Sequence, residues 1–432
     1  MKTTMKDMDY GAVMALPRPK YKAPRRPGLF WRLLIQVLSF FGLIGSGFRY
    51  EAELDGIGRD EPCLILMNHT CFLDMEIAHK ILFPRVFNIV ASNDGFIGLG
   101  GLMEWVMRSI GCIPTQKFVS DIRLVSDMEY CFKELKTSVL MYPEAGYSFD
   151  GTATTLPRKF GVLLKKLGVP VVMIETFGLF GRNPLYNELQ IRKDQKVFAR
   201  AYVLFTKEDI KTKTVKELSD GVDAAFGFDH FRWQKDNDVH ITQPFRADGL
   251  DRILYKCTAC GAEGRMKGRG TTLTCHACGK TWELTELGEV KARAGESEIS
   301  HIPHWYRWER EQVAADIENM AYKLDTDVTI AMQVDYKAVY MVGEGHLTHD
   351  NTGFHLTGCG GKLDYTQKPQ ACFGLYADYY WYEINDCICI GDNEVHYFLF
   401  PKDKAVSVAK IRLAAEEMYK LQKARKLPQP EN

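Results

Sequence analysis

An apolar run that stops at a polar pair is the feature that most constrains how this chain can fold. Residues 63–67 (Cys-Leu-Ile-Leu-Met) are apolar throughout and have the length of one strand, and Asn68 and His69 follow them directly. A run without polar alternation fits a strand of a mostly parallel sheet, which is buried on both faces. Ligands bind beyond the carboxyl ends of the strands in open α/β sheets, so we expect Asn68 and His69 at a binding edge.

An acidic residue follows this histidine at a useful distance. Asp74 comes five residues after His69, where residues 72–81 begin a helical pattern. A carboxylate placed there can accept a hydrogen bond from Nδ1 of the imidazole and leave Nε2 free to take a proton. The pair is therefore a candidate general base. Taken alone, the spacing also fits an ordinary histidine that is capped by a nearby carboxylate.

Length and cysteine content set the broad class of the protein. With 432 residues, the chain is long enough for two or three domains. Four of its 12 cysteines form two Cys-x2-Cys pairs, and the other eight are scattered through apolar segments. This usage favours a metal site and buried free thiols in a reducing compartment. The polar N-terminus does not have the pattern of a signal peptide, so we expect a cytoplasmic protein.

Residues 1–48 are expected to bring the chain to a membrane. Residues 1–50 hold nine Lys or Arg against two acids, and such a basic leader favours an anionic surface, either a membrane or a nucleic acid. Residues 1–27 have little periodicity and are expected to be mobile. Polar residues interrupt the apolar segment 29–48, so its apolar pieces are too short for a span of roughly 20 residues. Six large apolar side chains still share one side of a helix: Phe30, Leu33, Leu34, Val37, Phe40 and Phe41. This pattern indicates a helix lying in the interface, peripheral on the inner face of the membrane, with a core helix as the alternative.

Three further motifs follow the first one in order. Residues 111–117 (Gly-Cys-Ile-Pro-Thr-Gln-Lys) are a Gly-x-Ile segment closed by a basic residue, residues 142–148 read Tyr-Pro-Glu-Ala-Gly-Tyr-Ser, and residues 169–173 read Val-Pro-Val-Val-Met. With the first motif at residues 68–74, they resemble the four motifs of the glycerolipid acyltransferases, the family that includes 1-acylglycerol-3-phosphate acyltransferase. The third motif departs from the family pattern, because Tyr147 stands where an arginine is usual.

The resemblance implies a fold and a reaction. The implied fold is α/β, a mixed, mostly parallel sheet with helices, over residues 49–245. The implied reaction moves a fatty acyl group from acyl-CoA or acyl carrier protein to the free hydroxyl of a lysophospholipid, with lysophosphatidic acid as the first expected acceptor. His69 would be the general base, Asp74 would orient it, and Lys117 would hold the acceptor's phosphate. The expected substrate-binding residues are Asn68, Lys117, Glu144, Ser148, Arg158 and Lys159, of which Arg158 or Lys159 would replace the charge missing at Tyr147. A catalytically silent lipid- or partner-binding scaffold is the alternative, and the intact His69 and Asp74 pair argues against it.

Two cysteine pairs in residues 246–286 predict a zinc ribbon. Cys257 and Cys260 are separated from Cys275 and Cys278 by 14 residues, and a glycine follows each pair. Four thiolates at this spacing make a closed tetrahedral site for a structural Zn²⁺, and disulfides are the alternative. The basic residues of the ribbon also permit nucleic-acid binding. We expect none, because aromatic residues for stacking on bases are few.

The last third of the chain alternates short apolar runs with turn residues. Residues 285–300 are polar and are expected to be a linker, and residues 300–425 should form a β-rich domain closed by a helix over 406–423. The pattern is similar to a pleckstrin-homology or GRAM-type barrel, in which the helix plugs one end. Such barrels bind lipids or proteins, and a purely structural appendage fits equally well.

Overall fold

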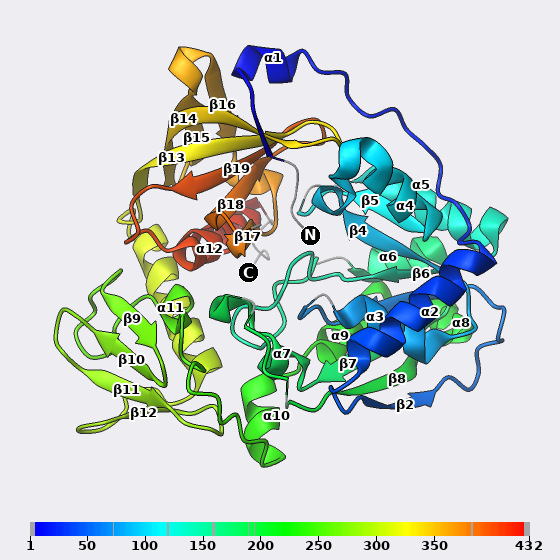
Figure 1. Ribbon diagram of the computed structural model, residues 1–432, viewed down its shortest axis with the longest axis horizontal. Helices are drawn as coiled ribbons and strands as arrows, with labels where there is room; N and C mark the ends of the chain where they lie inside the picture. The colour runs from blue at the N-terminus through cyan, green and yellow to red at the C-terminus, as the bar shows by residue number, and fades with distance from the viewer. Residues whose placement is uncertain are drawn as a thin grey trace, which may run out of the picture.

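A mixed β-sheet of the expected kind occupies the first half of the chain. The computed structural model describes residues 5–71, 73–118, 121–157, 160–188, 190–193, 195–381 and 383–426. Within them, the strand order of this sheet is β2-β8-β7-β3-β6-β4-β5, and only the β7–β8 pairing is antiparallel (Figure 1). The strands are β2 Arg49–Glu53, β3 Leu64–Met67, β4 Phe87–Ser92, β5 Cys112–Thr115, β6 Ser138–Met141, β7 Val171–Phe177 and β8 Phe198–Phe205. The predicted mixed, mostly parallel α/β sheet is confirmed.

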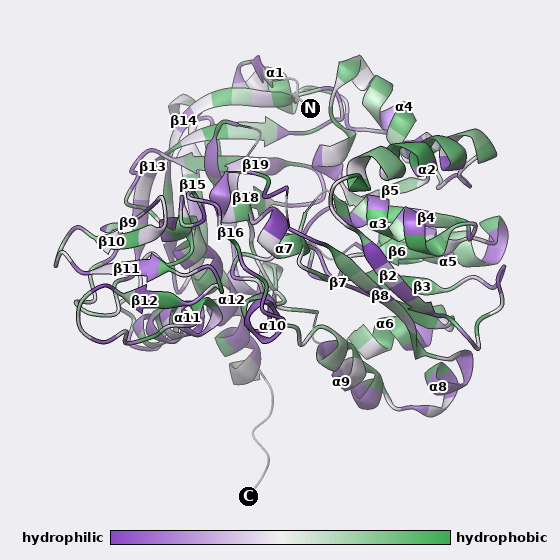
Figure 2. Cartoon of the chain, turned by 60° about the horizontal axis from the view of Figure 1, so that its bottom comes forward, coloured by the Kyte–Doolittle hydropathy of each residue, from purple (hydrophilic) through white to green (hydrophobic). Residues whose placement is uncertain are grey.

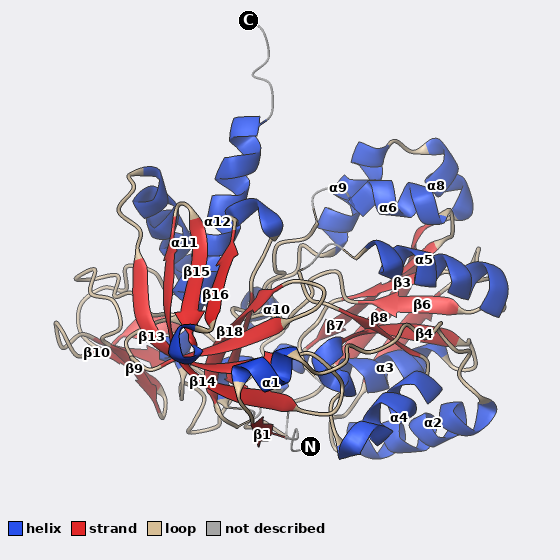
Figure 3. Cartoon of the chain, turned by 90° about the horizontal axis from the view of Figure 1, so that it is seen from above, coloured by secondary structure: helices blue, strands red, loops and turns tan. Residues whose placement is uncertain are grey.

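The central strand is apolar because both of its faces are covered. In β3, Ile65 packs with Ile77 in one core cluster, and Leu66 packs with Phe160 in the other. Side chains alternate between the two faces of a strand, so a strand between two helical layers must be apolar at every position. Figure 3 shows α2, α3 and α4 on one side of the sheet and α5, α6, α8 and α9 on the other. The bounds of these helices are α2 Leu29–Leu43, α3 Leu73–Leu82, α4 Leu102–Ser109, α5 Ile122–Tyr130, α6 Phe160–Leu167, α8 Lys207–Thr212 and α9 Val215–Ala225.

The N-terminal segment is ordered along the body of the protein, so the expectation of a mobile leader was wrong. Strand β1 (Met5–Asp7) pairs in parallel with β14 (Val339–Asp350), and helix α1 (Tyr10–Met14) follows it. The Tyr21 hydroxyl then donates to Asp127 Oδ1 at 2.6 Å. The partners in these two pairings lie more than a hundred residues away along the chain, and local periodicity does not reveal them.

A large antiparallel sheet confirms the β-rich C-terminal part. Its order is β16-β15-β14-β13-β19-β18-β17, with β1 added beside β14. The strands not yet named are β13 Leu324–Gln333, β15 Gly353–Gly358, β16 Leu363–Gln367, β17 Tyr376–Trp381, β18 Asn385–Gly391 and β19 His396–Pro401. Helix α12 (Val408–Lys426) ends the described chain and packs against α11 (Ile302–Glu318), β17 and β18. The likeness to a pleckstrin-homology or GRAM barrel stays a prediction.

A small sheet forms around the two cysteine pairs. Its order is β12-β11-β10-β9, with β9 Met266–Arg269, β10 Thr272–Cys275, β11 Thr281–Leu284 and β12 Val290–Ala292. The stretch 285–300 was expected to be a linker, and β12 corrects this because it pairs with β11 and extends the sheet beyond residue 286. Two short helices, α7 Leu179–Arg182 and α10 His230–Asp236, lie between this sheet and the first one (Figure 1).

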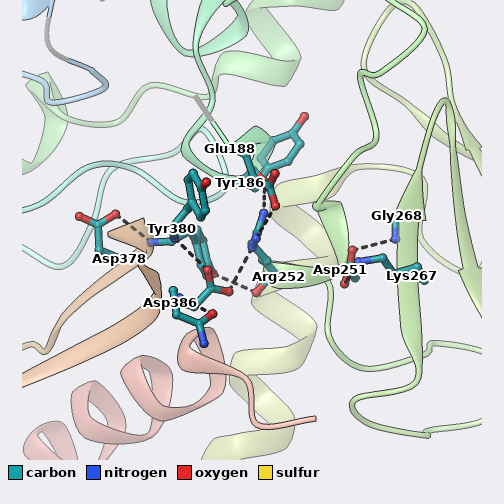
Figure 4. Close-up of polar contacts among 11 residues, drawn as sticks. Tyr186, Glu188, Asp251, Arg252, Lys267, Gly268, Asp378, Tyr380 and Asp386 are labelled. Atoms are coloured by element: carbon teal, nitrogen blue, oxygen red, sulfur yellow. Dashed lines mark hydrogen bonds and ion pairs between the residues drawn. The ribbon is translucent and has the colours of Figure 1, made fainter. Parts of the chain in front are cut away.

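Arg252 joins the three parts of the molecule. Its guanidinium pairs with Glu188 at 2.7 Å and with Asp386 of β18 at 3.1 Å, and it donates to the Tyr186 carbonyl at 3.0 Å (Figure 4). The neighbouring Asp251 accepts the amide N–H of Gly268 in β9 at 2.8 Å. The sheet of the first half, the cysteine ribbon and the C-terminal sheet are therefore linked through two adjacent residues.

Candidate active site

Asn68 fastens the central strand to its neighbour. The amide N–H of Thr176 in β7 donates to Asn68 Oδ1 at 2.8 Å, and Asn68 Nδ2 donates to the Thr176 carbonyl at 3.2 Å. Only 1% of Asn68 is exposed. Its side chain is thus engaged with the backbone of β7, which fits a role in positioning the next residue better than the predicted contact with substrate.

His69 and Asp74 meet at the carboxyl end of β3. His69 Nδ1 lies 2.8 Å from Asp74 Oδ2, and the exposed fractions of the two side chains are 20% and 1%. Asp74 also accepts the amide N–H groups of Thr70 at 2.8 Å and Cys71 at 3.1 Å, and the Thr70 hydroxyl at 3.1 Å. With its carboxylate fixed by four donors, Asp74 holds the imidazole in one orientation and directs Nε2 away from itself.

Two tyrosine rings enclose the imidazole. The His69 ring stacks on Tyr142 with centroids 4.0 Å apart, and its centroid lies 4.3 Å from that of Tyr147. The imidazole is thus held between two aromatic rings. From the sequence, Tyr147 was interpreted only as the replacement of an arginine, and its contact with His69 was missed. The two tyrosines of the third motif, Tyr142 and Tyr147, were the pattern that could have indicated this contact.

Glu144 is buried next to the His69 and Asp74 pair. Its Oε2 accepts the amide N–H of His69 at 2.7 Å, and its Oε1 accepts that of Thr154 at 3.0 Å. None of its surface is exposed, and burial raises the pKa of Glu144 to about 8. Glu144 therefore connects the turn after β3 to the loop of the third motif, and it fixes the position of the His69 backbone.

Ser148 closes the same loop. Its amide N–H donates to the His69 carbonyl at 3.1 Å, so the backbone of His69 is held on both sides. The Ser148 hydroxyl donates to the Thr152 carbonyl at 2.6 Å and accepts the Gly151 amide N–H at 3.0 Å. Ser148 is completely buried, like Glu144, and both residues hold the His69 backbone in place.

Lys117 lies apart from this group. It follows β5, which is three strands away from β3, or about 14 Å across the sheet at the usual strand spacing. Lys117 Nζ lies 3.9 Å from Asp94 Oδ2 and 3.7 Å from the centroid of the Tyr376 ring in the C-terminal sheet. The structure thus brings Asn68, His69, Asp74, Glu144 and Ser148 together, and Lys117 contacts Asp94 and Tyr376. The predicted contacts Arg158 and Lys159 lie outside the described residues.

The four ribbon cysteines form a cluster suited to a metal ion. Their Sγ atoms all lie within 4.8 Å of one another, and the pairs Cys257–Cys278 and Cys260–Cys275 are 3.9 and 3.8 Å apart. Four sulfurs at about 2.3 Å from a zinc ion occupy the corners of a tetrahedron with edges of about 3.8 Å. The cluster therefore has the size of a four-thiolate zinc site.

Comparison with known proteins identifies one part of the chain. Residues 51–174 match the family model described as Acyltransferase, and this segment contains His69, Asp74 and Glu144. Among solved structures, a match is the 1-acyl-sn-glycerophosphate (LPA) acyltransferase PlsC from Thermotoga maritima, at 17% identity and a TM-score of 0.34, covering 45% of this chain and 76% of that chain. No curated protein matches. The similarity to acyltransferases thus covers residues 51–174, and the ribbon and the C-terminal sheet lie outside the matched segment.

Proposed function

We propose that this protein transfers a fatty acyl group from a thioester donor, acyl-CoA or acyl carrier protein, to a lysophospholipid hydroxyl. The observation that carries the proposal is the hydrogen bond of 2.8 Å between His69 Nδ1 and Asp74 Oδ2, inside the segment that matches the acyltransferase family. The acceptor we place first is 1-acylglycerol-3-phosphate, following the family resemblance of the four motifs.

The geometry supports a direct transfer without a covalent enzyme intermediate. His69 Nε2 takes the proton of the acceptor hydroxyl as its oxygen attacks the thioester carbonyl. The new C–O bond forms, the C–S bond breaks, and the proton passes from His69 to the departing thiolate. Asp74 keeps Nδ1 protonated and stabilises the imidazolium that exists between the two proton transfers.

Other site residues have supporting roles in this scheme. Asn68, Glu144 and Ser148 fix the backbone around His69, as their buried hydrogen bonds indicate. We retain Lys117 as a proposed contact for the acceptor's phosphate, together with Arg158 and Lys159. Because Lys117 sits beside Tyr376, its contact with the acceptor would be made next to the C-terminal sheet.

An exposed apolar helix supports peripheral membrane association on the cytoplasmic side. Within the described residues, no helix is both long and apolar enough to cross a bilayer. Helix α2 is nevertheless largely hydrophobic (Figure 2), and its Phe30, Leu33, Phe40 and Phe41 are 49–69% exposed. Apolar side chains of this size favour the interface of a lipid leaflet, which is where the lysophospholipid resides.

We also propose that the ribbon holds one structural Zn²⁺ through Cys257, Cys260, Cys275 and Cys278. The sulfur distances fit a tetrahedral site, and four protein ligands leave no position for a reacting water. When bound, the ion would stabilise the fold of the ribbon. Its role is separate from the chemistry at His69.

Acyl transfer by the purified full chain tests the proposal. Wild type and His69→Ala are assayed in mixed micelles with lysophosphatidic acid and other lysophospholipids, using acyl-CoA and acyl carrier protein donors. We expect transfer by the wild type and a loss of at least about a thousandfold in His69→Ala. Equal activity in both proteins contradicts the role of His69. No transfer to any acceptor from either donor contradicts the proposed reaction.

A further inference from the structure

The loop that carries Glu144 is also attached to the C-terminal part of the protein. Residues 142–155 leave β6 and pass beneath His69. At the far end of this loop, the Thr155 hydroxyl donates to Glu416 Oε2 in α12 at 3.0 Å. In the middle of the loop, the Phe149 ring lies 4.3 Å below the guanidinium of Arg412, which also belongs to α12. One helix from outside the acyltransferase segment thus holds the loop at two points.

Glu416 is a rigid anchor for this attachment. Only 1% of it is exposed, and its two oxygens pair with Arg310 of α11 at 2.7 Å and with Arg412 at 3.2 Å. Burial alone would raise the pKa of Glu416, but the two guanidinium groups hold it below its usual value. The acceptor offered to Thr155 is therefore a charged carboxylate that is fixed from both sides.

A short series of bonds connects this anchor to the catalytic histidine. Thr154, next to Thr155, donates its amide N–H to Glu144 Oε1 and its hydroxyl to the Glu144 carbonyl, both at 3.0 Å. Glu144 in turn accepts the amide N–H of His69 at 2.7 Å. A shift of Thr155 would thus be felt at His69 through two intervening residues.

We propose that Glu416 is a positioning residue for acyl transfer, which it supports by fixing Thr155 and the loop that sets the backbone of His69. The C-terminal part then completes the catalytic site of the acyltransferase domain. The kinetic test of this inference rests on the proposed function. The physical reason is that a base must meet the acceptor hydroxyl at hydrogen-bonding distance, and small displacements of a catalytic group lower the rate steeply.

The sharpest variant removes one hydroxyl and keeps the shape of the side chain. Thr155→Val deletes the donor to Glu416, and Thr155→Ser restores it. Glu417→Gln is the matched control, because Glu417 pairs with the same Arg310 at 2.8 Å on the same helix. We expect Thr155→Val and Glu416→Gln to lower kcat about tenfold with little change in KM for the thioester. Thr155→Ser should restore most of kcat, and Glu417→Gln should stay near the wild type.

Two outcomes overturn the inference. One is a kcat for Thr155→Val within about twofold of the wild type, and the other is an equal loss in Glu417→Gln, which would indicate general weakening of the helix pair. A titration of the His69 ring by ¹⁵N NMR, assigned with His69→Ala, separates this inference from the proposed reaction. If neither the wild type nor any variant transfers acyl groups, but Thr155→Val and Glu416→Gln both shift the His69 titration and Glu417→Gln does not, positioning holds and the proposed reaction falls. If neither kcat nor the titration changes, positioning is refuted.

Discussion

Replacing Asp74 with asparagine removes one charge from the His69 and Asp74 pair and keeps its shape. Asp74 Oδ2 accepts three N–H donors, from His69 at 2.8 Å, Thr70 at 2.8 Å and Cys71 at 3.1 Å. Among the described residues, the partner of Oδ1 is the Thr70 hydroxyl, which can turn to accept a hydrogen bond. The new amide should therefore place its oxygen at the Oδ2 position and its NH₂ group toward Thr70, so that the imidazole keeps its tautomer.

The expected cost in rate follows from the lost charge. A carboxylate about 4 Å from the centre of an imidazolium, at an effective dielectric constant of about 20, stabilises the cation by up to about 4 kcal/mol. Since about 1.4 kcal/mol is a factor of ten, Asp74→Asn should lower kcat by about 10² to 10³. Three charge-assisted bonds also become neutral ones, and we expect the free energy of unfolding to fall by about 2–3 kcal/mol.

Steady-state transfer rates under saturating donor and acceptor, with urea unfolding of the same preparations, measure both effects. Thr70→Val is the matched control, because it removes only the hydroxyl bonded to Oδ1 and should change kcat by less than about fivefold. An Asp74→Asn kcat within about tenfold of the wild type would refute the role of the charge. A folded Asp74→Asn whose kcat falls by much more than about 10³ would refute the orientation deduced for the amide.

Three further predictions concern the metal, the buried acid and the exposed helix. Cys260→Ser should lose the one zinc per chain that we expect by elemental analysis and unfold at lower urea, whereas full metal content in this variant contradicts the four-thiolate site. Because burial raises the pKa of Glu144 to about 8, its protonated form stabilises the fold. Relative to Glu144→Gln, the wild type should thus be most stable below about pH 4.5 and lose this advantage as pH rises through 8, and parallel stability curves contradict this. Replacing Phe40 and Phe41 by serine should weaken sedimentation with anionic vesicles several-fold, and unchanged binding removes α2 from the membrane interface.

The centre of the first sheet could be predicted because its cause is local. Residues 63–67 are apolar without alternation, and only a strand covered on both faces requires that pattern. The placement of His69 could be predicted for the same reason, since a polar residue that directly follows such a strand lies at the carboxyl end of the sheet. The hydrogen bond to Asp74 also follows from local spacing, because Asp74 lies in the first turn of the next helix.

The position of Lys117 could not be predicted in this way. Its motif fixes where it stands in the sequence, whereas its distance from His69 depends on how many strands pair between β3 and β5. Strand order arises from long-range packing, so it cannot be derived from the spacing of motifs along the sequence. For the same reason the pairing of β1 with β14 could not be predicted, since neither strand has a local pattern that points to the other.

Helix α11 connects the cysteine ribbon to α12, the helix that holds residues 142–155. Glu309 accepts the amide N–H of Lys256 at 2.8 Å, directly before the first ribbon cysteine, and the next residue, Arg310, pairs with Glu416 at 2.7 Å. One turn of helix thus contacts both the ribbon and the anchor of the catalytic loop. A fragment that ended at residue 245 would leave Thr155 without this acceptor and expose apolar surface around Phe149, which is 2% exposed in the full chain. The segment that matches the acyltransferase model is therefore structurally incomplete by itself, because α12 supplies two of the contacts that hold residues 142–155.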